Sequence, residues 1–123
     1  MQRTWIALGA LAGMTAVAMA AFAAHGLGGL DAAAAGAVRS GIEMQAWHAL
    51  ALLACGLWAS RGGRWADAAG AAFTLGIALF CGGVYAVGLG AVRLGIMAPV
   101  GGTLLMAGWA LLGVSALIAA RRP

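Results

Sequence analysis

A small set of polar side chains interrupts an otherwise apolar chain, and their types allow several kinds of chemistry. Gln45 and His48 are three residues apart, so on a helix they share one face. With His25, Glu43 and Tyr85 they could relay protons, bind a polar ligand, or ligate a metal or haem. The full predicted polar cluster is His25, Glu43, Gln45, His48, Tyr85, Arg93 and Thr103.

The same side chains also have a structural interpretation, as an interhelical hydrogen-bond network that fixes a helical bundle. Glu43 and Arg93 would then be solvated charges at the membrane interface. Metal ligation is the weaker alternative, because two histidines without further His or Cys ligands make a poor zinc site. Bis-histidine haem ligation needs both rings at similar depth, and His48 is expected to lie deeper than His25. We therefore predict neither a metal nor a cofactor.

Motifs of the common enzyme classes are missing from the sequence. It contains no nucleophile elbow, phosphate-binding loop, dinucleotide fingerprint, HExxH motif or paired carboxylates. Glu43 is the only carboxylate expected near the membrane interior. The sequence therefore predicts a protein that is not an enzyme. An ordinary transporter is also disfavoured, because broken helices and inverted repeats are not evident.

The composition places these side chains in a membrane. Hydrophobic residues make up 64% of the 123 residues and charged residues 8%, whereas soluble domains have about 45–50% and about 25%. This difference excludes a soluble enzyme, a disordered tail and a nucleic-acid-binding domain. The net charge of +4 comes from scattered arginines, which in a membrane protein indicate topology and not a nucleic-acid partner.

Four apolar runs are long enough to cross ~30 Å of hydrocarbon as helices. We predict transmembrane helices at 5–24, 42–60, 66–91 and 97–120. A short surface helix is predicted at 31–39, with Asp31 as its cap. The first run resembles a signal peptide, but its length favours a retained membrane helix. The predicted fold class is all-α, a single integral membrane four-helix bundle over residues 1–123.

The arginines predict the orientation of this bundle. With the N-terminus inside, five arginines lie on the inner side and two on the outer side: Arg3, Arg61, Arg64, Arg121 and Arg122 against Arg39 and Arg93. This distribution satisfies the positive-inside rule and places both termini inside. Trp5 and Trp65 would then lie at the inner interface, and the polar cluster in the outer half of the membrane. The expected location is the bacterial inner (plasma) membrane.

Small residues recur at helical spacing along the predicted membrane helices. In lipid, helix association depends on close packing, which small residues permit. The predicted packing positions are Gly9, Gly13, Gly76, Gly82, Gly83, Gly101, Gly102 and Gly108. They would pack the helices within one bundle, or alternatively mediate oligomerisation or docking of another membrane subunit.

Four short motifs follow one another along the chain: AFAAHGL at 21–27, Gln45 with His48, LFCGGVY at 79–85, and PVGG at 99–102 followed by Gly108 and Trp109. Together they resemble the domain-of-unknown-function 423 family of small, YgdD-like membrane proteins. The resemblance covers nearly the whole chain and implies a four-helix membrane protein, without implying an activity. The chain departs from the family pattern at three positions where the family has a tyrosine or another hydroxyl residue: Met44, Cys81 and Ala98.

Three hypotheses for the function follow. The leading one is a non-enzymatic accessory or structural subunit that associates with itself, as a homo-oligomer, or with a larger membrane complex. The alternative is a ligand-binding or proton- or ion-conducting protein that uses the polar cluster. A weaker alternative is a redox protein that binds haem or quinone near His25 and His48. The expected partners are the lipid bilayer and other membrane subunits, and not nucleic acid.

Overall fold

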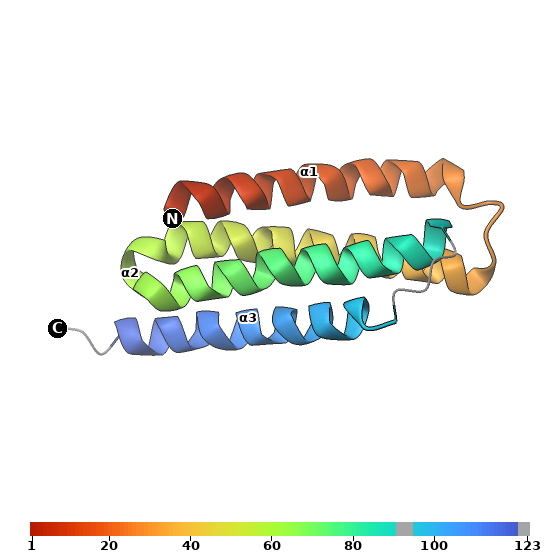
Figure 1. Ribbon diagram of the computed structural model, residues 1–123. Coiled ribbons are helices and arrows are strands. Elements are labelled where there is room, and N and C mark those ends of the chain that lie inside the picture. The colour runs from red at the N-terminus through yellow and green to blue at the C-terminus, as the bar shows by residue number, and fades with distance from the viewer. Residues whose placement is uncertain (91–94, 121–123) are drawn as a thin grey trace.

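The computed structural model describes residues 1–90 and 95–120, and all regular secondary structure within them is helical. Helix α1 runs over Gln2–Gly26, α2 over Ala32–Gly90 and α3 over Met97–Ala119. All three are long and apolar enough to cross a membrane. The structure thus confirms the all-helical class. The helices lie side by side, with α1 and α3 each packed on α2 (Figure 1).

Helix α2 turns back on itself at Gly63 (Figure 1). Gly63 has a φ of 53° and a ψ of −142°, a conformation that costs glycine little because it has no Cβ atom. We call residues 32–62 the first arm of α2 and residues 64–90 the second arm. The arms run antiparallel, since Tyr85 of the second bonds Gln45 of the first.

This reversal differs from the four separate helices that the sequence predicts. The described residues form three helices, and α2 includes both the run predicted at 42–60 and most of the run predicted at 66–91. The physical reason is that one glycine with a positive φ takes up the whole change of direction. Helical geometry therefore continues almost up to Gly63 on both sides, without a separate loop.

The segment expected to form a separate surface helix, 31–39, is instead the beginning of the first arm. Asp31 does cap it, because its Oδ1 accepts a hydrogen bond of 2.8 Å from the backbone N–H of Ala34. Val38 is fully buried and lies against Gly88 of the second arm. The apolar side of this segment therefore packs on the second arm of α2.

The main core lies between all the helices, towards the end where α2 bends. Its largest fully buried side chains are Phe73 and Leu52, and it also includes Cys55 and Leu105. Many large apolar side chains point outward instead, such as Val17, which is 71% exposed. This arrangement suits a bundle in lipid, where outward apolar side chains carry no cost and helices associate through close packing.

Trp5, which the sequence predicts at the inner interface, is buried in this core near the start of α1. It is 5% exposed, and its indole Nε1 donates a hydrogen bond of 2.7 Å to Oδ1 of Asp67. A buried indole N–H requires such an acceptor. The bond fixes the start of α1 beside the bend of α2. Trp65 is half-buried, with the Arg64 guanidinium 5.3 Å from its ring centre.

Candidate functional site

Gln45 forms the centre of a hydrogen-bond network where α1 meets both arms of α2. Its Nε2 donates to the backbone oxygen of Ala12 at 3.0 Å and to Oγ1 of Thr15 at 2.6 Å. Its Oε1 accepts a hydrogen bond of 2.8 Å from the hydroxyl of Tyr85. The side chain is 6% exposed. One amide thus joins three segments of the chain, and we call these four residues the Gln45 network.

A glycine brings Tyr85 within reach of this amide. Gly41 lies one helical turn before Gln45, and a Cβ atom at Gly41 would approach the Tyr85 ring to 2.5 Å. The sulfhydryl of Cys81 donates to the backbone oxygen of Gly41 at 3.4 Å. The two arms of α2 therefore approach closely at Gly41, and this contact lets the tyrosine hydroxyl reach Gln45.

His48 makes a second set of contacts, towards α3. Its Nδ1 lies 2.6 Å from the backbone oxygen of Met44, and its Nε2 lies 3.1 Å from the indole Nε1 of Trp109. Because the indole can only donate, Nε2 accepts, and the proton of a neutral ring is assigned to Nδ1. The ring also packs against Phe73 with a centroid distance of 5.6 Å. Both ring nitrogens therefore have partners within the protein, which disfavours metal or haem ligation by His48.

The structure separates the remaining members of the predicted polar cluster from these contacts. His25, Glu43 and Thr103 are exposed. The Thr103 hydroxyl donates a hydrogen bond of 2.9 Å to the backbone oxygen of Pro99 in its own helix. Arg93 lies outside the described residues. Of the predicted cluster, Gln45 and Tyr85 bond each other directly, while His48 faces a different neighbour.

The bonded polar residues lie at the middle level of the helices. Gln45 contacts Ala12 and Thr15, halfway along α1, and His48 contacts Trp109, halfway along α3. The sequence predicts Gln45 and His48 near the start of a helix at 42–60, in the outer half of the membrane. The reason is that the first arm begins at Ala32, ten residues before the predicted start of that helix at 42, so that Gln45 and His48 lie near its middle.

Several polar contacts could not be predicted from the sequence. Thr15 and Trp109 complete the two sets of contacts described above, and Trp58 donates a hydrogen bond of 3.1 Å to Oγ of the buried Ser115. The available signal is the presence of tryptophan inside apolar runs, because a buried indole N–H needs an acceptor. Which acceptor it meets depends on how the helices are rotated.

Most of the predicted packing glycines lie at close helix contacts. At Gly101 a Cβ atom would overlap the backbone nitrogen of Phe80. Gly9, Gly76, Gly83 and Gly108 also lie against neighbouring segments at short distance. Looser contacts surround Gly13 and Gly102, and Gly82 has open space around it. Further close contacts occur at glycines that the sequence analysis does not single out: Gly41, Gly56, Gly62, Gly70 and Gly88.

A shallow apolar hollow of about 340 Å³ lies between the first arm of α2 and α3, next to His48. Its walls include Trp47, Phe80, Met106 and Trp109. Across residues 1–90 and 95–120, no buried side-chain nitrogen or oxygen lacks a hydrogen-bond partner. In the same residues, no group of three or more His, Cys, Asp or Glu side chains is placed to hold a metal ion.

Fold and site together define a class: a small helical membrane protein whose buried polar side chains join its helices to one another. The chain belongs to the family described as protein of unknown function (DUF423), whose model matches residues 19–102. The comparison confirms the resemblance noted from the sequence motifs.

Bacterial relatives match over most of their length. A UPF0382 membrane protein of Haemophilus influenzae is 39% identical over 111 residues, which cover 89% of this chain and 90% of the relative. The UPF0382 inner membrane protein YgdD of Escherichia coli K12 is 36% identical, covering 94% and 90%. A UPF0382 membrane protein of Staphylococcus epidermidis is 37% identical, covering 94% and 96%. No solved structure matches the chain. These relatives place the chain in the bacterial inner membrane.

Proposed function

We propose that this chain is a non-enzymatic structural or accessory protein of the inner membrane, which associates with itself or with a larger membrane complex. The observation that carries the proposal is the use made of the buried polar side chains. Gln45, His48 and Tyr85 direct their polar atoms into hydrogen bonds within the bundle. Such bonds orient helices in lipid, where the hydrophobic effect does not. The surface that remains for association with other membrane proteins is then the outer surface of the bundle.

The proposal includes four membrane crossings with both termini inside. Each arm of α2 is longer than the ~20 residues that a crossing needs. The end of the bundle where α2 bends carries Arg3, Arg61 and Arg64, whereas the opposite end carries Arg39. Helix α3 ends on the side where α1 begins (Figure 1). The positive-inside rule therefore favours the bend on the cytoplasmic side.

Cysteine labelling tests this topology. In a background with the native Cys55 and Cys81 changed to alanine, a single cysteine is placed at Gly28, Ser60 or Gly95, and cells are treated with a membrane-impermeant maleimide. Gly28→Cys and Gly95→Cys should react in intact cells. Ser60→Cys should react only after the membrane is broken. Gly28 and Gly95 have open space around them and Ser60 is exposed. Reaction at all three positions from one side would contradict the four crossings.

Association is tested by native mass spectrometry of the untagged protein, extracted gently from its own membrane. The proposal predicts either a small multiple of the chain mass or a larger assembly that contains unrelated chains. A monomer throughout, at protein concentrations comparable to those in the membrane, would contradict it.

The second candidate is a ligand-binding or conducting protein, favoured by the hollow beside His48. His48→Phe and Trp109→Phe remove the same hydrogen bond from its two ends and keep an aromatic ring in place. A structural role predicts that each variant lowers the free energy of unfolding by about 1 kcal/mol. A conducting role predicts instead that His48→Phe alone abolishes a pH-dependent proton flux in proteoliposomes. That outcome, with stability unchanged, would replace the structural proposal.

A further inference from the structure

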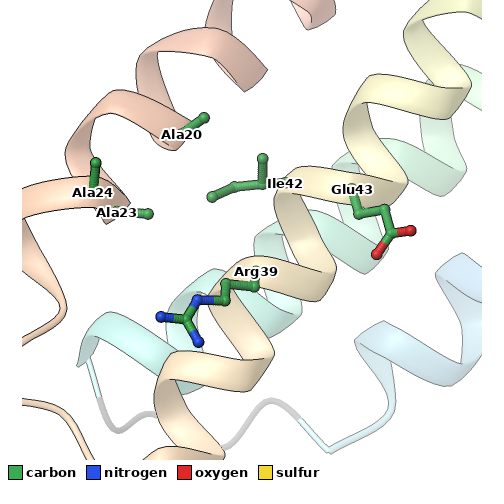
Figure 2. Close-up of a pocket in the computed structure, with 6 residues that line it drawn as sticks. All are labelled: Ala20, Ala23, Ala24, Arg39, Ile42 and Glu43. Carbon is green, nitrogen blue, oxygen red and sulfur yellow. The ribbon is translucent and has the colours of Figure 1, made fainter.

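A long groove follows the seam between α1 and the first arm of α2. Its apolar part, about 490 Å³, reaches from Gly9 to Ala20 on α1 and from Ile42 to Leu53 on the first arm. A second hollow of about 400 Å³ continues it towards the end opposite the bend (Figure 2). The two parts share Ala20 and Ile42 as lining residues. We call the whole the seam groove.

The side chains along the seam explain the shape of the groove. Its floor consists of glycines and alanines, including Gly13, Ala16 and Ala49. Its rims carry large apolar side chains, of which Val17 is 71% and Leu50 60% exposed. At 1.5 Å per residue the groove extends for roughly 22 Å along α1, somewhat more than the ~15 Å of one leaflet's hydrocarbon. A single acyl chain has the width and length that this surface accommodates.

Two opposite charges lie at the end of the groove away from the bend. Arg39 and Glu43 are one helical turn apart on the first arm and line the hollow together with Ala20, Ala23 and Ala24. Figure 2 shows the guanidinium of Arg39 extending towards α1, while the carboxylate of Glu43 points away from it. Side chains at this spacing have Cβ atoms about 5–6 Å apart. The charged end thus offers one cation and one anion from neighbouring turns of the first arm, with their charged groups directed to different sides.

We propose that the seam groove binds one phospholipid with a zwitterionic headgroup. The acyl chain lies in the apolar part, the phosphate lies against Arg39, and the headgroup ammonium, two carbons further on, lies against Glu43. Charge complementarity favours this occupant over an anionic lipid, because an anionic headgroup has no positive group to place beside Glu43. The inference goes beyond the structural role proposed above and does not depend on it.

Lipid titration followed by native mass spectrometry tests the proposal. The detergent-purified full chain is titrated with phosphatidylethanolamine or with phosphatidylglycerol that has the same acyl chains, so that only the headgroup differs. The wild type should bind phosphatidylethanolamine more tightly. Arg39→Gln should weaken that binding about fivefold, the size expected for one basic side chain at a membrane surface. Arg64→Gln loses the same charge at the other end of the bundle and should bind like the wild type.

Two further variants and one control distinguish lipid binding by the charged end from lipid binding by the apolar part of the groove. Glu43→Gln should bring the affinities for the two lipids together, because it removes the partner of the ammonium. Ala46→Leu fills the apolar part and should reduce binding of both lipids. Ala18→Leu is an equal enlargement at an exposed position on α1 that does not line the groove. This variant should bind both lipids as the wild type does. Equal affinity of the wild type for both lipids, a preference for phosphatidylglycerol, or unchanged binding by Arg39→Gln or Ala46→Leu would overturn the proposal.

Discussion

Replacing Gly101 with alanine is expected to lower the free energy of unfolding by about 3 kcal/mol, the upper range for an overpacked contact. The added Cβ atom would overlap the backbone nitrogen of Phe80 and would lie 2.8 Å from its Cα atom. Backbone atoms cannot rotate away as a side chain can. Helix α3 would therefore have to move off the second arm of α2, which also loosens the contact between Gly76 and Leu105.

The control for this substitution lies on the same helix. Gly113 has no atom within 4 Å of the position that a Cβ would occupy. Gly113→Ala should leave stability unchanged or raise it by up to ~1 kcal/mol, because alanine favours helix over glycine. Unfolding in mixed micelles, with increasing dodecyl sulfate and circular dichroism as the signal, measures both variants. Equal effects of the two substitutions would contradict the described packing of α3.

The helices themselves could be predicted from the sequence, because an apolar run in lipid must satisfy its backbone internally. What could not be predicted is how α2 reverses. The segment around Arg61 to Trp65 is rich in glycine and therefore indicates a turn, but it does not show that a single residue suffices. Gly63 alone leaves helical geometry. The glycine content therefore indicates where the chain reverses, but not how many residues the reversal takes.

The candidate site, too, could be predicted from the sequence only in part. The spacing of Gln45 and His48 predicts that they share one helix face, but in the structure they face different neighbours, because spacing on one helix says nothing of the rotation of the helices around it. Those rotations send Gln45 to Thr15 and Tyr85, and His48 to Trp109. The same limit explains why Trp5 lies in the core, bonded to Asp67, although its position near the start of α1 is typical of an interfacial residue.

Replacing Gln45 with leucine is expected to lower the free energy of unfolding by about 2 kcal/mol. The substitution removes three interhelical hydrogen bonds, to Ala12, Thr15 and Tyr85, and such bonds contribute ~0.6 kcal/mol each in membrane proteins. Leucine is close in size to glutamine, so packing changes little. Tyr85→Phe removes only one of these bonds and should cost about 0.6 kcal/mol.

A double-mutant cycle identifies the bond between the two arms of α2. Because both substitutions remove the bond between Gln45 and Tyr85, the double variant should be more stable than the sum of the single effects predicts, by about 0.6 kcal/mol. Thr103→Val serves as the control, since that exposed hydroxyl bonds only its own helix, and should change stability by less than ~0.5 kcal/mol. Strictly additive effects would mean that Gln45 and Tyr85 are not bonded.

The measured coupling also bears on function, because a hydroxyl and an amide that stabilise the bundle through each other hold the two arms of α2 in register. A bundle fixed in this way presents a constant outer surface to the partners that the proposed accessory role assumes.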